Sequence, residues 1–310
     1  TAASITAAGV GAGGIDGIFI GWTALKTRSA SNRSVEGVAV NGNTVITAST
    51  AGYIQRSTDG GVSWVETRLN INSSNSWDFF GILYNPDLSQ WLLWNNGGDI
   101  LYSTNNGASW ASAQNKNTAT DGIHQIVWSG SQYVAAVRGG SQTSSNGTSW
   151  SSKHTFGAYD SYNNSIAYGN STYVMSYADY GGGQYKVLSS TNGSSWTERV
   201  SGTNADVSGG IVYFNGAFRY VRSDKLLFTS TNGTSFTATS TFLFAGFNAR
   251  VMIDNGSGGI LVNPSGSQVG YSSDGVNFAV ASFTLATCYA YSSTTRYIGA
   301  GNGIIWLTNV

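Results

Sequence analysis

Short apolar runs separated by polar turn residues recur along the whole chain. Seven of these runs are almost continuously apolar, and Gly, Asn or Ser follows closely after each: residues 37–40, 81–84, 125–128, 165–168, 210–213, 250–253 and 288–291. A short run without polar alternation is typical of a strand that is buried on both faces. We therefore predict seven inner strands, each enclosed between neighbouring sheets.

A second strand is predicted after each of these turns. In most repeats it starts with an aromatic residue, as at Trp91, Tyr133, Tyr173, Phe218 and Tyr297. No segment shows the spacing of apolar residues that marks an amphipathic helix. The pattern indicates an all-β protein built from similar units.

One phrase recurs at regular intervals and ends each time in an aromatic ring. It has eight residues at 57–64 and 103–110, and seven residues at 144–150, 190–196, 230–236 and 272–278. The rings are Trp64, Trp110, Trp150, Trp196, Phe236 and Phe278, so the steps between them are 46, 40, 46, 40 and 42 residues. A period of about 40 to 50 residues is typical of propeller blades.

Each phrase predicts a tight hairpin turn. Its Asp or Asn stands shortly before Gly, and both residues tolerate the positive φ that such turns need. The side-chain oxygen can accept hydrogen bonds from backbone N–H groups inside the turn. Four of the six copies carry Asn, which cannot do acid–base chemistry, so we interpret the set as structural: Asp59, Asn105, Asn146, Asn192, Asn232 and Asp274.

The phrase resembles the Asp-box, or bacterial neuraminidase repeat, with the pattern S-x-D-x-G-x-[ST]-W. That repeat occurs in sialidase-type propellers, in sortilin-type receptors and in propellers without known activity. Two copies match the eight-residue form and four are one residue shorter. The resemblance implies that the boxes join the third and fourth strands of each blade, and that loops on the opposite face bind ligands.

These observations predict a seven-bladed β-propeller with four-stranded antiparallel blades. Residues 1–14 are rich in Gly and Ala, which suits a flexible tether. Residues 15–310 would then form a single domain. The strand-like run at 17–26 has no box before it, and the chain ends at about the point where a further box should begin. We therefore expect the N-terminal strand to complete the last blade, which would close the ring.

Composition narrows the classes of partner. Only 10% of the residues are charged, against roughly 25% in ordinary soluble domains. The surface must therefore be largely Ser, Thr, Asn and Gly, as is common in virion, tail-fibre and secreted carbohydrate-binding proteins. The formal net charge is +0 and no Lys/Arg run is present, which argues against nucleic acid as a partner.

Other sequence features set further limits. Cys288 is the single cysteine, so no intrachain disulfide can form, and it lies in an apolar run that favours a buried, inert thiol. No apolar run approaches the roughly 20 residues of a membrane helix. The N-terminus as given does not resemble a signal peptide.

Candidate ligand-binding residues lie in the segments predicted to form the loop face. Aromatic rings beside Asp, Asn and Arg are typical of sugar sites, although Tyr and Trp could also simply fill these loops. Glu36, Phe80, Gln125, Asn164 and Ser165 stand just before or at the start of inner strands. The candidates are Trp77, Asp78, His124, Arg138, Tyr159, Asp160, Tyr162, Tyr177, Asp179, Tyr180 and Arg250.

An enzymatic site has weaker support. The resemblance to sialidases implies three arginines, a Tyr activated by a Glu, and an acidic Asp. The only glutamates are Glu36, Glu66 and Glu198, and the Phe/Tyr-Arg-Ile-Pro motif is missing. A pair of aspartates could act as in glycosidases, but no spacing singles out a pair. Two histidines and scattered aspartates show no metal-ligand spacing, so no metal, cofactor or catalytic residue is predicted.

The sequence favours a non-enzymatic binding or structural propeller. Its setting would be a virion (phage tail, fibre or capsid decoration) or the cell surface or another extracellular site. Its partner would be a glycan or a protein, with other virion proteins reached through the N-terminal tether. A glycoside hydrolase or sialidase-like enzyme is the alternative, and an assembly scaffold is the second alternative.

Overall fold

The structure is a computed structural model. It describes residues 22–27, 34–69, 78–114, 122–156, 165–179, 184–203, 210–222 and 226–241, and then the strands between Val251 and Thr308. For residues 22–27, 178–179 and 239–241, for residue 203, and for every strand after residue 250, only the backbone is described. The predicted tether at 1–14 lies outside the described residues.

The strands form four-stranded antiparallel sheets that follow one another along the chain. The first three sheets are β2 (Val35–Asn41), β3 (Thr44–Ser49), β4 (Tyr53–Ser57) and β5 (Val65–Arg68); β6 (Phe79–Asn85), β7 (Gln90–Asn95), β8 (Ile100–Ser103) and β9 (Ala111–Ser112); and β10 (Ile123–Trp128), β11 (Tyr133–Val137), β12 (Gly140–Ser144) and β13 (His154–Thr155). The short 3-10 helix η1 (Thr50–Gly52) joins β3 to β4.

The fourth and fifth sheets repeat this order, and two more follow. They are β14 (Ser165–Gly169), β15 (Thr172–Asp179), β16 (Gln184–Ser190) and β17 (Thr197–Thr203); β18 (Val212–Phe214), β19 (Ala217–Val221), β20 (Leu226–Ser230) and β21 (Thr237–Thr241); β22 (Val251–Asp254), β23 (Ile260–Ser265), β24 (Gln268–Ser272) and β25 (Ala279–Ser282); and β26 (Cys288–Ser292), β27 (Arg296–Gly301), β28 (Ile304–Thr308) and β1 (Trp22–Thr27).

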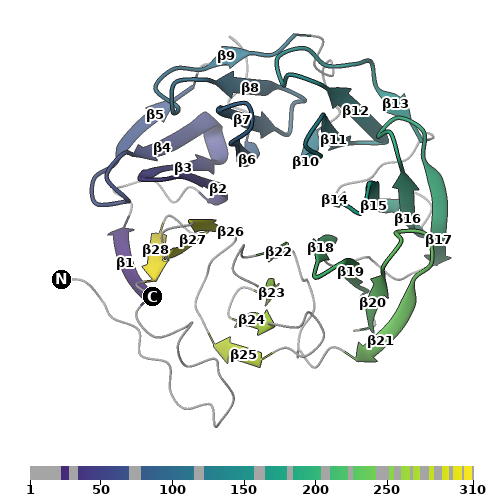
Figure 1. Ribbon diagram of the computed structural model, residues 1–310. Helices are drawn as coiled ribbons and strands as arrows, with labels where there is room; N and C mark the ends of the chain where they lie inside the picture. The colour runs from purple at the N-terminus through teal and green to yellow at the C-terminus, as the bar shows by residue number, and fades with distance from the viewer. Residues whose placement is uncertain are drawn as a thin grey trace.

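The sheets are arranged around a common centre, with the first strand of each sheet innermost (Figure 1). Each inner strand contacts the next one along the chain, and β26 contacts β2. The predicted inner strands coincide with β2, β6, β10, β14, β18, β22 and β26 to within a few residues. The all-β prediction is confirmed, and the sheets are four-stranded and antiparallel as predicted.

The N-terminal strand pairs with the last strand of the chain. β1 lies antiparallel to β28, with Trp22 opposite Thr308 and Thr27 opposite Ile304. The outermost strand of this sheet therefore comes from the opposite end of the sequence, as the unpaired run at 17–26 predicts. Figure 1 shows both strands beside the first sheet.

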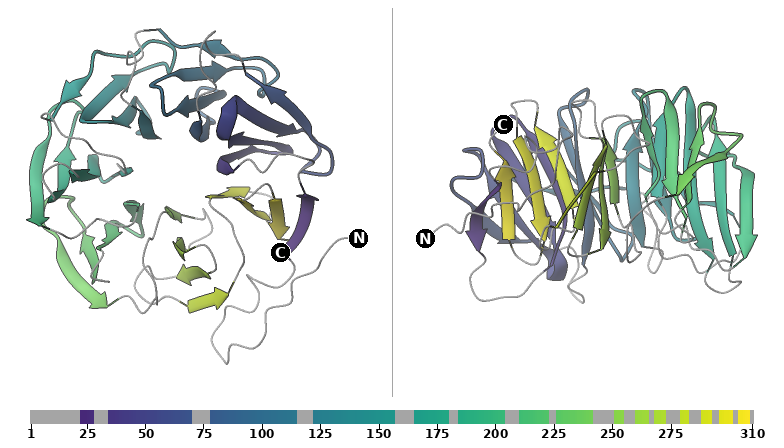
Figure 2. Two further views of the ribbon diagram at one scale, coloured as in Figure 1. Left: turned by 180° about the vertical axis from the view of Figure 1, so that it is seen from behind. Right: turned by 90° about the horizontal axis from the view of Figure 1, so that it is seen from below.

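The strands run between two faces, which the side view in Figure 2 shows at the two ends of the sheets. Because neighbouring strands are antiparallel, the turns after the first and third strands of a sheet lie on one face, here called the box face. The turns after the second strand and the links between sheets lie on the other, here called the loop face. Gly60 of the first box donates to the carbonyl of Asn43 in its own first turn, at 2.9 Å, as this arrangement requires.

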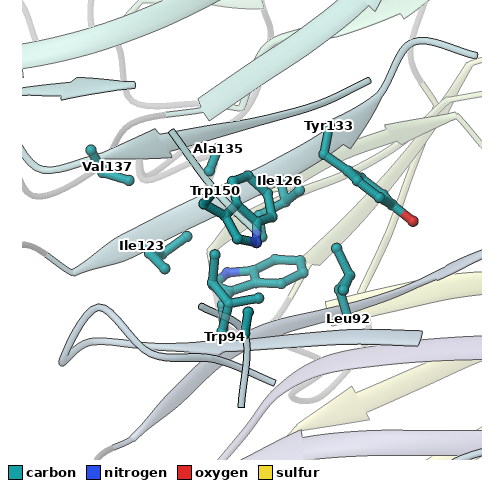
Figure 3. Close-up of a cluster of buried hydrophobic side chains, with 10 residues drawn as sticks. Leu92, Trp94, Ile123, Ile126, Tyr133, Ala135, Val137 and Trp150 are labelled. Carbon is teal, nitrogen blue, oxygen red and sulfur yellow. The ribbon is translucent and has the colours of Figure 1, made fainter. Parts of the chain in front are cut away.

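The core lies between adjacent sheets. One cluster joins Leu92, Trp94 and Ile100 of the second sheet to Ile126 and Trp150 of the third, and Figure 3 shows these layers meeting. The aromatic residues that start the second strands lie in this and the neighbouring core clusters, and Trp91, Tyr133, Tyr173 and Phe218 are at most 2% exposed. Removing a fully packed ring of this size costs about 3–5 kcal/mol.

The box turns are held by the hydrogen bonds that their composition suggests. In the seven-residue form, the Asn192 oxygen accepts from the backbone N–H groups of Ser194 and Ser195 at 3.0 and 2.8 Å. The Trp196 indole donates to the carbonyl of Gly193 at 3.1 Å. Asn146 and Asn232 accept in the same way, so one turn geometry recurs in these sheets.

The first box uses a carboxylate in the same role. Asp59 accepts from the backbone N–H of Ser63 at 2.8 Å and from the hydroxyl of Ser57 at 2.7 Å. Hydrogen bonds from the Ser63 side chain and backbone, with a further one from Ser57, lower the pKa of Asp59 to about 2. Asn105 takes this position in the second box, where it accepts from the backbone N–H of Ser109 at 3.0 Å. Asp274 and Phe278 of the last box lie outside the described residues.

The boxes of the second to fifth sheets also join their own sheet to the preceding one. Gln90 of the second sheet donates to the carbonyl of Asn146, and Gln132 of the third sheet to that of Asn192, at 3.1 and 2.9 Å. The box glycines sit against the preceding sheet so closely that a Cβ at Gly193 would lie 2.5 Å from Val134. The recurring turn is therefore a joint between sheets as well as a hairpin.

Candidate functional site

Three successive inner strands carry a β-bulge where they begin, on the loop face. Pairing with the second strand shifts register between Val35 and Gly37, between Phe79 and Gly81, and between Ile123 and Gln125. The residues left at these shifts, here called the bulge residues, are Glu36, Phe80 and His124. A bulge redirects the side chain that it carries, and bulges are frequent beside functional sites.

The bulge at Phe80 places an apolar ring on the surface. Phe79 is fully buried, whereas Phe80 is 38% exposed. The rings of Phe80 and His124 lie with their centroids 6.2 Å apart at an interplanar angle of 33°. Two adjacent sheets therefore present neighbouring rings on the loop face.

The backbone beneath the bulge residues is closely packed. A Cβ at Gly37 would lie 2.9 Å from the Cα of Gly81, so β2 and β6 approach each other at two glycines. A Cβ at Gly81 would lie 2.3 Å from the Trp94 ring, whose indole donates to the carbonyl of His124 at 3.3 Å. Because Gly37 and Gly81 have no side chain, β2 and β6 can lie close together. This brings Glu36 on β2 near Phe80 on β6, and Phe80 in turn lies beside His124 on β10.

Polar groups connect the inner strands of the third to fifth sheets. The Gln125 side-chain oxygen accepts from the Ser165 hydroxyl at 2.8 Å and from the Ile166 N–H at 3.0 Å. The Ser165 oxygen then accepts from the N–H of Ile211 at 3.0 Å. β14 pairs with β15 without a register shift, so its first residue is held by hydrogen bonds and not by a bulge.

Asp78 ties the first two sheets together. Its carboxylate accepts from the N–H of Ala51 in η1 at 2.8 Å. Its backbone N–H donates to the Asn96 side chain, and the Asn96 N–H donates to its carbonyl, both at 3.1 Å. One carboxylate oxygen is therefore engaged in fixing the loops beside Phe80, and Asp78 acts on this site as a positioning residue.

The other candidate ligand-binding residues from the sequence do not gather at the bulge residues. Tyr177 is 1% exposed and lies edge-on to Phe156 with centroids 6.2 Å apart, so it belongs to the core and is not a surface ligand group. Arg138 is partly buried at the start of the turn between β11 and β12, where its N–H donates to the carbonyl of Gly122 at 3.1 Å. Asp179 lies in β15 opposite Gln184. Trp77, Tyr159, Asp160, Tyr162, Tyr180 and Arg250 lie outside the described residues.

One further polar residue of the loop face is buried inside its own turn. Asp99 is 6% exposed, and its carboxylate accepts from the Asn95 side chain at 3.0 Å inside the turn between β7 and β8. Among the described residues, no group of three or more His, Cys, Asp or Glu gathers in one place. None of the described segments is a helix with the length and hydropathy of a membrane span.

The bulges themselves were not predicted. The apolar pattern places Glu36 and Phe80 at the start of inner strands but does not indicate the register shift. The available signal is the dipeptide that ends in glycine, Glu36-Gly37 and Phe80-Gly81, because Gly inside a strand often marks a bulge or a close approach.

Comparisons with known proteins support the architecture. No family model and no curated protein matches the chain. Among solved structures, YCF48 bound to D1 peptide has a TM-score of 0.68 at 11% identity and covers 93% of this chain and 97% of its own. The WD40 β-propeller domain of Doa1 has a TM-score of 0.68 at 12% identity over the same shares of the two chains.

A third structure, YCF48 from Cyanidioschyzon merolae, has a TM-score of 0.63 at 12% identity and covers 93% of this chain and 99% of its own. The fold is that of a β-propeller. In total 1372 solved chains match. An architecture shared so widely does not by itself indicate an activity. It is consistent with a binding or structural module.

Proposed function

We propose that this protein is a non-enzymatic propeller that binds a segment of a partner protein on its loop face, at the bulge residues Glu36, Phe80 and His124. The observation that carries the proposal is the exposed ring of Phe80 at a bulge on β6, beside the glycines at which β2 and β6 approach each other. An exposed aromatic side chain on a rigid backbone is a typical anchor for a partner. Glu36 adds a carboxylate for a polar or cationic group beside it.

The proposed framework is a closed ring of seven blades. The pairing of β1 with β28 and the contact of β26 with β2 support closure by the N-terminal strand. In such a ring the starts of the inner strands converge around the axis. A partner segment could then contact Phe80 and His124 together.

A peptide partner is favoured over a glycan by one comparison and one feature of the site. The similar YCF48 structure holds a D1 peptide. The described part of the loop face here presents one exposed large ring, Phe80, because Tyr177 is buried. Sugar sites usually combine aromatic faces with several free polar groups, and the Asp78 carboxylate already accepts from Ala51. Glycan binding is therefore tested as the alternative to peptide binding.

The test begins with random dodecapeptides displayed on phage and selected on the intact protein. Enriched sequences are then measured as synthetic peptides against wild type, Phe80→Ala and Val62→Ala. Val62 is the matched control because it is 79% exposed but lies in a box turn on the other face. We expect Phe80→Ala to weaken binding at least tenfold, or about 1.4 kcal/mol, and Val62→Ala to leave it unchanged.

Either of two results would overturn the proposal: selected peptides that bind Phe80→Ala as well as wild type, or a glycan array in which binding is lost in Phe80→Ala while no peptide is enriched. The second result would assign the same face to carbohydrate recognition.

The proposed setting is a virion or an extracellular assembly. Its support is the low charge of the chain, since 10% charged residues leave a surface of neutral polar groups. Genes for capsid, tail or baseplate proteins beside this one would support a virion, and partners would then include other virion proteins. Neighbouring genes of central metabolism would argue against it.

A further inference from the structure

A pocket lies between the outer parts of the first and second sheets, away from the bulge residues. Its volume is about 250 Å³. Ile54, Leu69 and Leu101 form apolar walls, Trp110 and Ser109 of the second box form one side, and Arg68 stands on the outer strand β5. This volume is too small for a folded domain and suits one amino-acid side chain with adjoining backbone.

The pocket is lined by the last residues of the second box. The last residues of the third box, at the junction between the second and third sheets, show what such residues can bind. Between the second and third sheets, Gln114 forms a parallel bridge with Ser149 of the third box. The Gln114 N–H donates to the carbonyl of Thr148 at 2.7 Å, and the Trp150 N–H donates to the carbonyl of Gln114 at 3.1 Å. Gln114 alone therefore provides hydrogen-bond partners for two backbone groups of the third box, the carbonyl of Thr148 and the N–H of Trp150.

The equivalent groups of the second box are the carbonyl of Ala108 and the N–H of Trp110, and both residues line the pocket. Neither group has a backbone hydrogen bond to another of the described residues. The Trp110 indole differs from the others as well. The indoles of Trp64, Trp150 and Trp196 donate to a carbonyl of their own turn, whereas the buried Trp110 Nε1 has no such partner among the described residues.

We propose that this pocket binds an extended peptide segment. One residue of the peptide would donate its N–H to the carbonyl of Ala108 and accept from the N–H of Trp110. Gln114 makes the same two hydrogen bonds with Thr148 and Trp150 at the next junction. An apolar side chain of the peptide would fill the space between Ile54, Leu101 and Trp110. Arg68 lines the pocket, and its positive charge favours an acidic residue of the peptide next to it. The site is independent of the proposed loop-face function.

The experiment uses the intact protein and the pentapeptide acetyl-Ser-Val-Gln-Asp-Ser-amide, with an Asn version in which Asp is replaced. Backbone amide exchange of Trp110 and Trp150 is followed by NMR. We expect the Trp110 N–H to exchange rapidly in the free protein and at least tenfold more slowly with saturating peptide. The Trp150 N–H is bonded in both states and should not change.

Two pairs of variants locate the peptide. Thr67→Trp fills the pocket from an exposed position of β5 and should weaken binding at least tenfold, whereas Thr197→Trp on the exposed outer strand β17 should not. Arg68→Gln should remove the preference for Asp over Asn, whereas Arg199→Gln, also exposed on β17, should retain it. Phe80→Ala should bind this peptide normally, which separates the pocket from the loop-face site.

The proposal falls if the Trp110 N–H is already protected without peptide, because another part of this chain would then occupy the bridge. It also falls if the peptide leaves Trp110 exchange unchanged at millimolar concentration, or if Thr67→Trp and Thr197→Trp have the same effect.

Discussion

Single side-chain oxygens organise the hairpins of this protein. Asn192, for example, accepts from two backbone N–H groups and from the Ser190 hydroxyl, with distances of 2.8 to 3.1 Å. These are local interactions within one turn, so a substitution here should affect stability without moving distant residues. Asp59 performs the same task in the first box, which indicates that the acceptor oxygen matters more than the charge.

Asn192→Ala should therefore lower the free energy of unfolding by about 1–2 kcal/mol, because the turn loses its acceptor. Asn192→Asp keeps the acceptor and should stay closer to wild type. Urea denaturation followed by tryptophan fluorescence measures both. Equal losses in the two variants would show that the amide N–H groups, and not the oxygen, hold the turn.

Tyr133 gives a prediction for alkaline pH. It is fully buried, its hydroxyl donates to Gln90 at 3.0 Å, and the hydroxyl accepts from Asn85 at 2.7 Å. Burial raises the pKa of Tyr133 to about 12 from an ordinary value of 10.0, so the folded state holds this proton more tightly than the unfolded state. The resulting stability is complete below pH 10 and is lost as the pH rises through 12.

The measurement is the unfolding free energy at several pH values between 9 and 12. Wild type should lose more stability over this range than Tyr133→Phe, which carries no ionisable group at this position. If both proteins lose stability equally, Tyr133 does not titrate within the folded core.

At the scale of elements, the contacts between sheets depend on small residues at fixed places. Gly193 has a φ of +74° and contacts Val134 of the preceding sheet, whereas Gly216 has the same φ of +74° with no atom within 4 Å of a Cβ placed there. A substitution at Gly216 therefore tests backbone strain alone, whereas a substitution at Gly193 tests backbone strain together with packing between sheets.

Gly216→Ala should cost about 1–2 kcal/mol, which is the price of a left-handed conformation for an L-residue. Gly193→Ala should cost about 1–3 kcal/mol more, because the added methyl group also overpacks the junction with Val134. Thermal unfolding of the two variants compares these costs. Similar losses would mean that the junction can relax around the methyl group.

At the scale of the whole molecule, the two ends of the chain form one sheet. β28 has β27 on one side and β1 on the other, so removing β1 would expose the edge of β28. A propeller gains stability from continuity around its ring, and an open edge also favours association with other chains.

Deletion of residues 1–27 should therefore lower the unfolding free energy by at least about 3 kcal/mol, on the scale of losing a packed structural element, and should promote aggregation. Deletion of residues 1–14 is the matched control and should leave stability unchanged if these residues are a tether. Denaturation and light scattering of the two proteins test this. A 28–310 protein as stable as the full chain would contradict ring closure by β1.

The repeating units follow from local sequence patterns alone. Local turn chemistry around residues such as Asn192 and Gly193, and apolar runs such as 81–84, depend only on neighbouring residues, so they could be recognised without a structure. The pairing of β1 with β28 was also predictable, because a strand without a box at one end complements a missing strand at the other.

Which of these residues reach the surface depends on contacts between distant parts of the chain. The bulge that exposes Phe80 and buries Phe79 depends on the register with β7 and on the close approach of Gly37 to Gly81. Tyr177 carries the same sequence signal as a surface ring but is buried against Phe156. Register and contacts between sheets involve residues far apart in the chain, and a local pattern therefore does not contain them.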